Sequence, residues 1–135
     1  MQESEDLLVA FLRAMGAASL CALIFVPFPY RWMDAVHRRL GMGKLPDAPV
    51  VMYLARSTSI FYGIFGALLW MISFDVHHHR DLLVFVAGTY LFMGLALTVV
   101  DWVESMPRFW KLGEGPIVFA LGLLTLWLTL SLGPD

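Results

Sequence analysis

The amino-acid sequence predicts an all-α, polytopic membrane protein in which four transmembrane helices form an up-down bundle. Apolar residues make up 59% of the 135 residues and charged residues only 15%, whereas soluble domains average roughly 45–50% and about 25%. A soluble domain of this size has too little interior to bury so much apolar surface. The apolar residues also gather in four long runs, and most Lys and Arg residues lie in two of the loops.

Each apolar run is long enough to cross a bilayer as a helix. A helix rises about 1.5 Å per residue, so roughly 20 residues cross a hydrocarbon core about 30 Å thick. Backbone amides inside lipid must be satisfied within their own segment, and the alternating pattern of a transmembrane barrel is absent. We expect a single transmembrane domain, residues 1–135, with helices at about 7–26, 50–74, 82–100 and 113–132.

The distribution of Lys and Arg predicts the orientation of these helices. The first and third loops, with the adjoining helix ends, hold seven of the nine Lys and Arg residues, and the opposite side holds only Arg13 and Arg80. Loops rich in Lys and Arg tend to stay in the cytoplasm. We therefore expect a multi-pass protein of the cell (inner) membrane with both termini on the non-cytoplasmic side. The acidic start lacks the positive charge of a secretory signal, so the first run is expected to remain as a helix.

The first loop is long enough to hold a short helix that lies on the membrane surface. In the segment 30–41, Trp32, Met33, Val36 and Leu40 fall on one helical face, and the Arg residues fall elsewhere. Such a basic, amphipathic segment is typical of interfacial helices, in which Arg side chains meet anionic lipid headgroups. The alternative is a charged turn that only determines topology.

Charged residues near the expected cytoplasmic interface form the first candidate site. They are Arg56, Asp101, Glu104 and Glu114. A charge inside a membrane helix is costly and is usually paired or functional. One interpretation is a clamp between helices in which Arg56 pairs with a carboxylate. The other is an anion, proton or substrate site at the same place.

The opposite side carries the densest polar segment of the chain, FDVHHHRD. Asp75 and Asp81 belong to this segment, and Arg13 of the first helix is expected at about the same depth. The simplest interpretation is a polar hairpin loop in which Arg13 pairs with Asp75 or Asp81.

Three consecutive histidines in this segment, His77, His78 and His79, open a second interpretation. Histidine and carboxylate are common ligands of zinc, iron and copper. Adjacent histidines in a tight loop cannot all face one ion, so a metal site would need Asp75, Asp81 or Glu residues near the N-terminus. Histidine also titrates near neutral pH, which would suit proton or substrate handling. Beyond this metal alternative, the sequence predicts no cofactor.

Small residues recur at three- and four-residue steps on every expected helix. Membrane helices pack through such residues because lipid supplies no hydrophobic drive between them. The candidate packing residues are Ser59, Gly63 and Gly66 on the second helix, Gly94 and Thr98 on the third, Gly122 on the fourth, and Ala10, Ala14, Ala17 and Cys21 on the first. The alternative is that these faces line a ligand path.

The sequence favours an interaction protein over an enzyme. It contains no Gly-rich phosphate loop, nucleophile elbow, HExxH or Cys-x-x-Cys motif, and it lacks the dense Lys and Arg field that a nucleic-acid partner requires. We expect a small integral membrane protein that self-associates or joins a larger membrane complex as a structural subunit. Two alternatives stay open: binding or transport of a small molecule, lipid or proton by the charged clusters, and a membrane metalloprotein that uses the three histidines.

Overall fold

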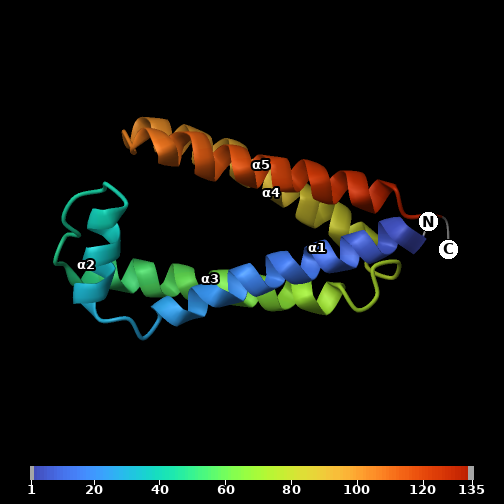
Figure 1. The fold of residues 1–135 in the computed structure, drawn as a ribbon, viewed down its shortest axis with the longest axis horizontal. Helices are drawn as coiled ribbons and strands as arrows, with labels where there is room; N and C mark the ends of the chain where they lie inside the picture. The colour runs from blue at the N-terminus through green and yellow to red at the C-terminus, as the bar shows by residue number, and fades with distance from the viewer. Residues whose placement is uncertain (1, 134–135) are drawn as a thin grey trace. The chain divides into compact units, whose positions relative to one another are not determined.

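The computed structural model describes residues 2–133, and all regular elements within them are helical. Figure 1 shows their order along the chain. The elements are α1 (Gln2–Leu20), the 3-10 helix η1 (Cys21–Phe25), α2 (Tyr30–Arg39), α3 (Pro49–Ile72), α4 (Arg80–Val103) and α5 (Arg108–Leu130). In this part of the chain four helices are long and apolar enough to cross a membrane, α1 being counted together with η1. The all-helical class is therefore confirmed for the described residues.

All four long helices begin before their expected starts, whereas α3 and α5 end two residues before their expected ends. The first helix begins at Gln2 rather than at about residue 7. Glu3 and Glu5 lie in its first turn, where acidic side chains interact favourably with the positive end of the helix dipole. The last begins at Arg108 rather than at about residue 113, directly after Pro107. Hydropathy marks the part of a helix suited to lipid, whereas the backbone stays helical into the polar segments on either side.

The chain falls into two compact units. The first unit contains residues 2–11 and 72–133, and the second unit contains residues 12–71. The helix α1 therefore contributes its first half to one unit and its second half to the other. The four-helix arrangement within one domain stays a prediction.

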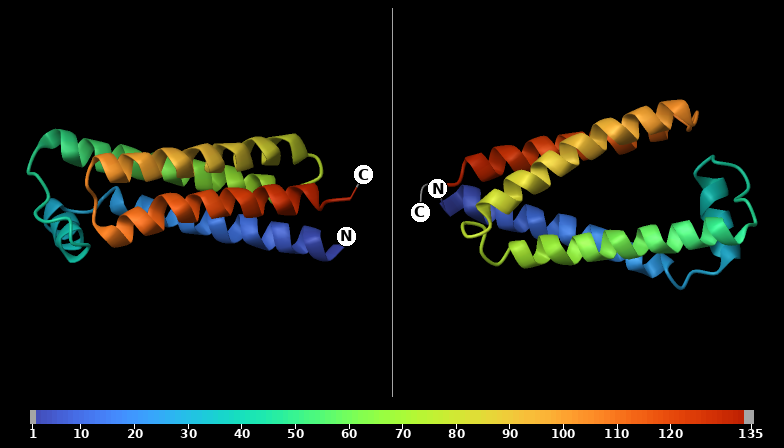
Figure 2. Two further views of the ribbon diagram at one scale, coloured as in Figure 1. Left: turned by 90° about the horizontal axis from the view of Figure 1, so that it is seen from above. Right: turned by 180° about the vertical axis from the view of Figure 1, so that it is seen from behind.

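In the first unit, α4 and α5 run antiparallel and side by side (Figure 2). Glycines bring their backbones together. A Cβ atom added to Gly94 would lie 2.5 Å from the backbone nitrogen of Phe119, and one added to Gly122 would lie 2.8 Å from that of Leu91. Such distances are too short for a real side chain, so the close approach depends on glycine. The buried side chains of this pair include Leu83, Ala87, Tyr90, Thr125, Leu128 and Thr129.

In the second unit, the second half of α1 packs against α3 in the same way. A Cβ atom added to Gly66 would lie 2.6 Å from the carbonyl oxygen of Gly16 and 2.8 Å from the backbone nitrogen of Leu20. A Cβ atom added to Gly63 would lie too close to the side chain of Leu23, which belongs to η1 directly after α1. Because Gly16 and Gly66 have no side chains, the backbones of α1 and α3 can approach each other closely along this contact.

The short helix α2 is held to the loop that follows it. The Tyr30 hydroxyl donates to the Leu45 carbonyl at 2.5 Å, and the Leu45 amide donates to Asp34 Oδ1 at 2.8 Å. Arg38 Nε donates to Asp34 Oδ2 at 3.0 Å. The hydrogen bond from Leu45 is the main reason why the pKa of the Asp34 carboxyl lies below its usual value, and Arg38 lowers it further. None of the residues of α2 is buried.

Replacing Asp34 with asparagine is expected to loosen the loop around Leu45. The neutral amide is a weaker acceptor than a carboxylate, so hydrogen exchange at the Leu45 amide should become faster. Because the pKa of Asp34 is lowered by folding, its contribution is fully present above the usual Asp range and is lost as pH falls through the lowered pKa. Asp47→Asn, which changes an exposed carboxylate in the same loop, is the control. Unchanged exchange at the Leu45 amide in Asp34→Asn would show that the Asp34 carboxylate does not hold this loop.

Candidate functional site

A buried carboxyl group lies near the end of α4 in the first unit. Asp101 is only 3% exposed and shares the buried face of α4 that also holds Gly94 and Tyr90. Its Oδ2 atom has no hydrogen-bond partner among residues 2–133. A buried polar atom without a partner is unfavourable and unusual in a folded protein. Asp101 is therefore the most conspicuous polar group of this unit.

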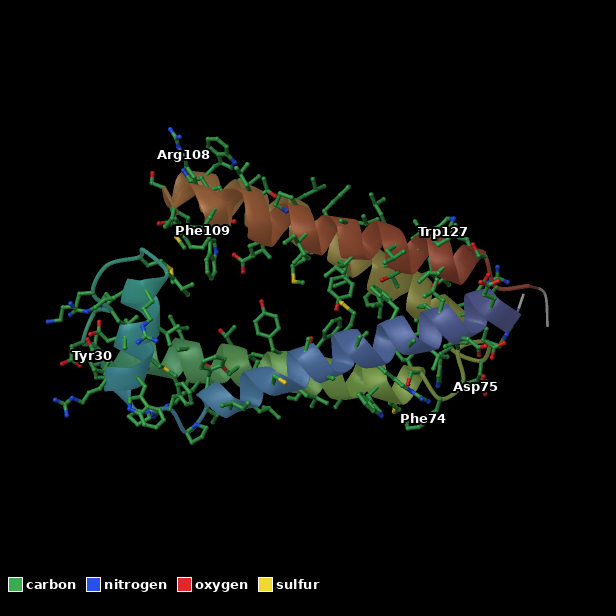
Figure 3. All side chains as sticks on the ribbon, in the orientation of Figure 1. Tyr30, Phe74, Asp75, Arg108, Phe109 and Trp127 are labelled. Atoms are coloured by element: carbon green, nitrogen blue, oxygen red, sulfur yellow. The ribbon has the colours of Figure 1, made fainter. Side chains whose placement is uncertain are left out.

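A second carboxyl group, that of Glu114 on α5, lies close enough to Asp101 for the two to interact electrostatically. Trp110, one turn earlier on α5, donates its indole N–H to Glu114 Oε2 at 2.5 Å. The nearby cation Lys111 sits over the ring of Trp102, 4.8 Å from its centroid. Asp101 and Glu114 thus share the end of the unit at which α4 gives way to α5, where Figure 3 labels Arg108 and Phe109.

The other members of this candidate site lie elsewhere. Glu104 is exposed and caps the C-terminus of α4. Arg56 belongs to the second unit, whereas all three carboxylates belong to the first. The clamp between Arg56 and a carboxylate therefore stays a prediction.

The polar segment between α3 and α4 is a turn that contacts the start of α1 within the first unit. His77 Nε2 lies 3.4 Å from Glu5 Oε2. Asp75, labelled in Figure 3, accepts a hydrogen bond from the backbone N–H of His78 at 3.0 Å. The rings of His78 and His79 meet edge to face, 4.9 Å apart. The segment is therefore ordered by its own contacts and by one acidic residue of α1.

Both interpretations of this polar segment stay predictions. Arg13 lies in the second unit, and Asp75 and Asp81 lie in the first, so the expected pairing stays a prediction. No group of three or more His, Cys, Asp or Glu side chains within residues 2–133 is arranged to hold a metal ion. The metal alternative also stays a prediction.

One face of α1 is covered by α3, and another is open. Gly16 packs against the backbone of Gly66 and Trp70. By contrast Ala14, Ala17 and Cys21, which follow one another at three- and four-residue steps, are all exposed. Ala10, in the first unit, is exposed as well. We call Ala14 and Ala17 of α1, together with Cys21 at the start of η1, the open face of α1.

A shallow groove of about 420 Å³ follows one face of α3 near its start. Its lining residues are Pro49, Met52, Tyr53, Arg56, Ser57 and Ile60. Arg56 Nη2 donates to the Phe28 carbonyl at 3.4 Å, and its side chain is exposed. The Ser57 hydroxyl donates to the backbone carbonyl of Tyr53 in its own helix. The groove therefore combines an apolar lining with one guanidinium group.

Comparison of the chain with protein-family models, with curated proteins and with solved structures finds no match. Sequence reasoning grouped Asp101 with Glu114 by their expected depth. It did not anticipate that Trp110 would bind Glu114, although the four-residue spacing within one helix was a usable signal. It also named the N-terminal glutamates only as a class, because nothing in the sequence singles out Glu5 as the contact of His77.

Proposed function

We propose that this chain is a small integral membrane protein that acts as an interaction subunit and self-associates through the open face of α1. The observation that carries the proposal is the exposure of Ala14, Ala17 and Cys21 on a helix whose other face is already packed. Small side chains offer lipid little apolar surface, but they let a second helix approach closely.

The use of small residues elsewhere in the chain supports this proposal. Gly63 and Gly66 on α3, and Gly94, Gly115 and Gly122 on α4 and α5, all meet a neighbouring helix at very short range. Gly88 and Gly113 have open space around them, but no second small residue continues their faces at helical spacing as on α1. The open face of α1 resembles the covered faces in composition, and a second copy of the chain would cover it. A symmetric pair is the commonest arrangement for such a contact.

The proposed setting is the cell membrane, with both termini on the non-cytoplasmic side. Four helices of suitable length and apolar character support insertion. Within the first unit, the start of α1 and the end of α5 lie at the same end (Figure 1), as expected if both termini face one compartment. The second unit, residues 12–71, holds six of the nine Lys and Arg residues and two of the eleven Asp and Glu residues. Five of those six, all but Arg13, belong to the first loop or to the helix ends beside it, which supports a cytoplasmic first loop.

Cys21, the single cysteine of the chain, makes this proposal directly testable because it lies on the open face. The purified protein is reconstituted into liposomes at low density and oxidised with copper phenanthroline. We expect a dimer band on non-reducing gels that disappears on reduction, because an interface through this face brings two Cys21 thiols together. Ala17→Leu should reduce the band by enlarging a side chain at the centre of the interface.

The matched control moves the thiol to another exposed position at a similar depth. Phe61 on α3 is 70% exposed, and the neighbouring Gly63 packs against Leu23, close to Cys21 in the chain. The double variant Cys21→Ser, Phe61→Cys should give little dimer. Equal cross-linking at both positions would indicate random collision, and no cross-linking at Cys21 would indicate a monomer. Either result would overturn the proposal.

A second candidate function is binding of a small cation at Asp101 and Glu114. It is favoured by the buried Asp101 Oδ2 atom, which has no hydrogen-bond partner among the described residues. Carboxylates inside membrane helices commonly mark ion or substrate sites. Asp101→Asn, which removes one of the two carboxyl groups, should lose this binding.

A further inference from the structure

We propose that the groove on α3 binds one anionic glycerophospholipid, with its phosphate at Arg56 and an acyl chain along the apolar lining. This inference is independent of self-association, because the groove lies on α3 and the open face lies on α1. It assigns a ligand and a binding residue to the second unit.

The position of Arg56 is the first reason. It is the eighth residue of α3, so a rise of about 1.5 Å per residue places its Cα roughly 10 Å along the helix. A guanidinium group at that depth in an apolar helix is unfavourable unless it reaches acceptors near the membrane interface. Lipid phosphates are the most abundant acceptors at that level.

The hydrogen bonding of Arg56 is the second reason. A guanidinium group has five N–H donors, and the Phe28 carbonyl, at 3.4 Å, is a long contact for one of them. Within the second unit the two carboxylates are Asp34 and Asp47. Asp34 already binds the Leu45 amide and Arg38. A phosphate can accept two parallel hydrogen bonds from the planar guanidinium fork, which a single backbone carbonyl cannot.

The lining of the groove is the third reason. Met52, Tyr53 and Ile60 flank Arg56 on the same face of α3, and Tyr53 and Ile60 are 69% and 44% exposed. Pro49, Met52 and Tyr53 lie between the start of the helix and Arg56, and Ile60 continues the apolar lining one turn further towards the middle of the helix. An acyl chain whose phosphate is bound at the start of α3 by the extended Arg56 side chain would run along this lining. The excess of Lys and Arg in the second unit complements an anionic lipid rather than a zwitterionic one.

The test compares lipids on the purified full chain in a neutral detergent. Phosphatidylglycerol, phosphatidylcholine or inorganic phosphate is added, and binding is followed by native mass spectrometry and by the melting temperature read from the five tryptophans. We expect one phosphatidylglycerol to be retained and to raise the melting temperature more than phosphatidylcholine does. Inorganic phosphate should have little effect, because it cannot occupy the apolar lining.

The variants locate the site. Arg56→Gln should weaken phosphatidylglycerol binding about tenfold, as expected for the loss of a charged hydrogen-bonding group. The affinity of Arg56→Lys for phosphatidylglycerol should lie between those of Arg56→Gln and the wild type. Arg108→Gln, which removes an exposed arginine at the start of α5 in the first unit, is the control and should bind as the wild type does. Cross-linking through Cys21 should be unchanged in all three.

Four outcomes would overturn the proposal. Equal binding of both phospholipids would indicate an unspecific apolar surface, and an equal effect of inorganic phosphate would indicate a free-phosphate site. Equal weakening by Arg56→Gln and Arg108→Gln would indicate diffuse attraction. A lower melting temperature of Arg56→Gln without added lipid, together with unchanged phosphatidylglycerol affinity, would show that the Arg56 guanidinium binds another group of the protein rather than a lipid phosphate.

Discussion

Replacing Gly94 or Gly115 with alanine is expected to destabilise the protein by about 1–3 kcal/mol for each substitution, as overpacking of a tight contact usually does. The new Cβ at position 94 would lie 2.5 Å from the Phe119 backbone nitrogen, and that at position 115 would lie 2.7 Å from the Thr98 backbone nitrogen. Backbone atoms cannot move aside as a flexible side chain can, so α4 and α5 must separate. Reversible unfolding in mixed micelles measures the change in the free energy of unfolding.

Two other glycines provide the control for this prediction. Nothing lies within 4 Å of a Cβ atom added to Gly88 or Gly113, and both lie inside helices. Alanine is favoured over glycine in a helix by roughly 0.5–1 kcal/mol, so Gly88→Ala and Gly113→Ala should be neutral or slightly stabilising. The same loss of stability in all four variants would contradict the close packing of α4 on α5.

Replacing Asp101 with asparagine is expected to stabilise the protein. Asp101 is 97% buried and its Oδ2 atom has no hydrogen-bond partner among the described residues, and the carboxyl of Glu114 lies nearby. An amide cannot carry a negative charge, and it can donate a hydrogen bond to a helix carbonyl. An unsatisfied buried polar atom costs about 1–3 kcal/mol, which is the gain expected in the free energy of unfolding.

The control for this prediction is Glu104→Gln, which changes an exposed carboxylate one turn further along and should have little effect. A loss of stability in Asp101→Asn would show that the carboxylate has a partner in the membrane-embedded protein. That result would contradict the prediction. If the variant is stabilised, a salt-dependent shift of the wild-type melting temperature that disappears in Asp101→Asn would support cation binding. The absence of that shift would argue against it, since a functional group is often kept at the expense of stability.

The sequence was sufficient for the helical class and for the number of helices that could cross a membrane. Apolar runs of about 20 residues report on the free energy of transfer into lipid, which is a property of each segment alone. The same runs did not show where each helix begins, because polar residues such as Glu3 and Arg108 continue the helix outside the apolar part. Short-range contacts were within reach of sequence reasoning where the spacing was helical, as for Trp110 and Glu114.

Only the tertiary structure decided which groups meet. The contact of Glu5 with His77 joins residues 72 positions apart. The hydrogen bond from the Leu45 amide to Asp34 joins residues 11 positions apart across a loop. The burial of Asp101 and the exposure of Ala14, Ala17 and Cys21 also depend on which helix faces which. Two helical faces of similar composition have the same local preferences, so the choice of the covered face comes from the fit of backbones and side chains between helices. That fit is a property of pairs of segments, whereas the suitability of a segment for lipid belongs to the segment alone.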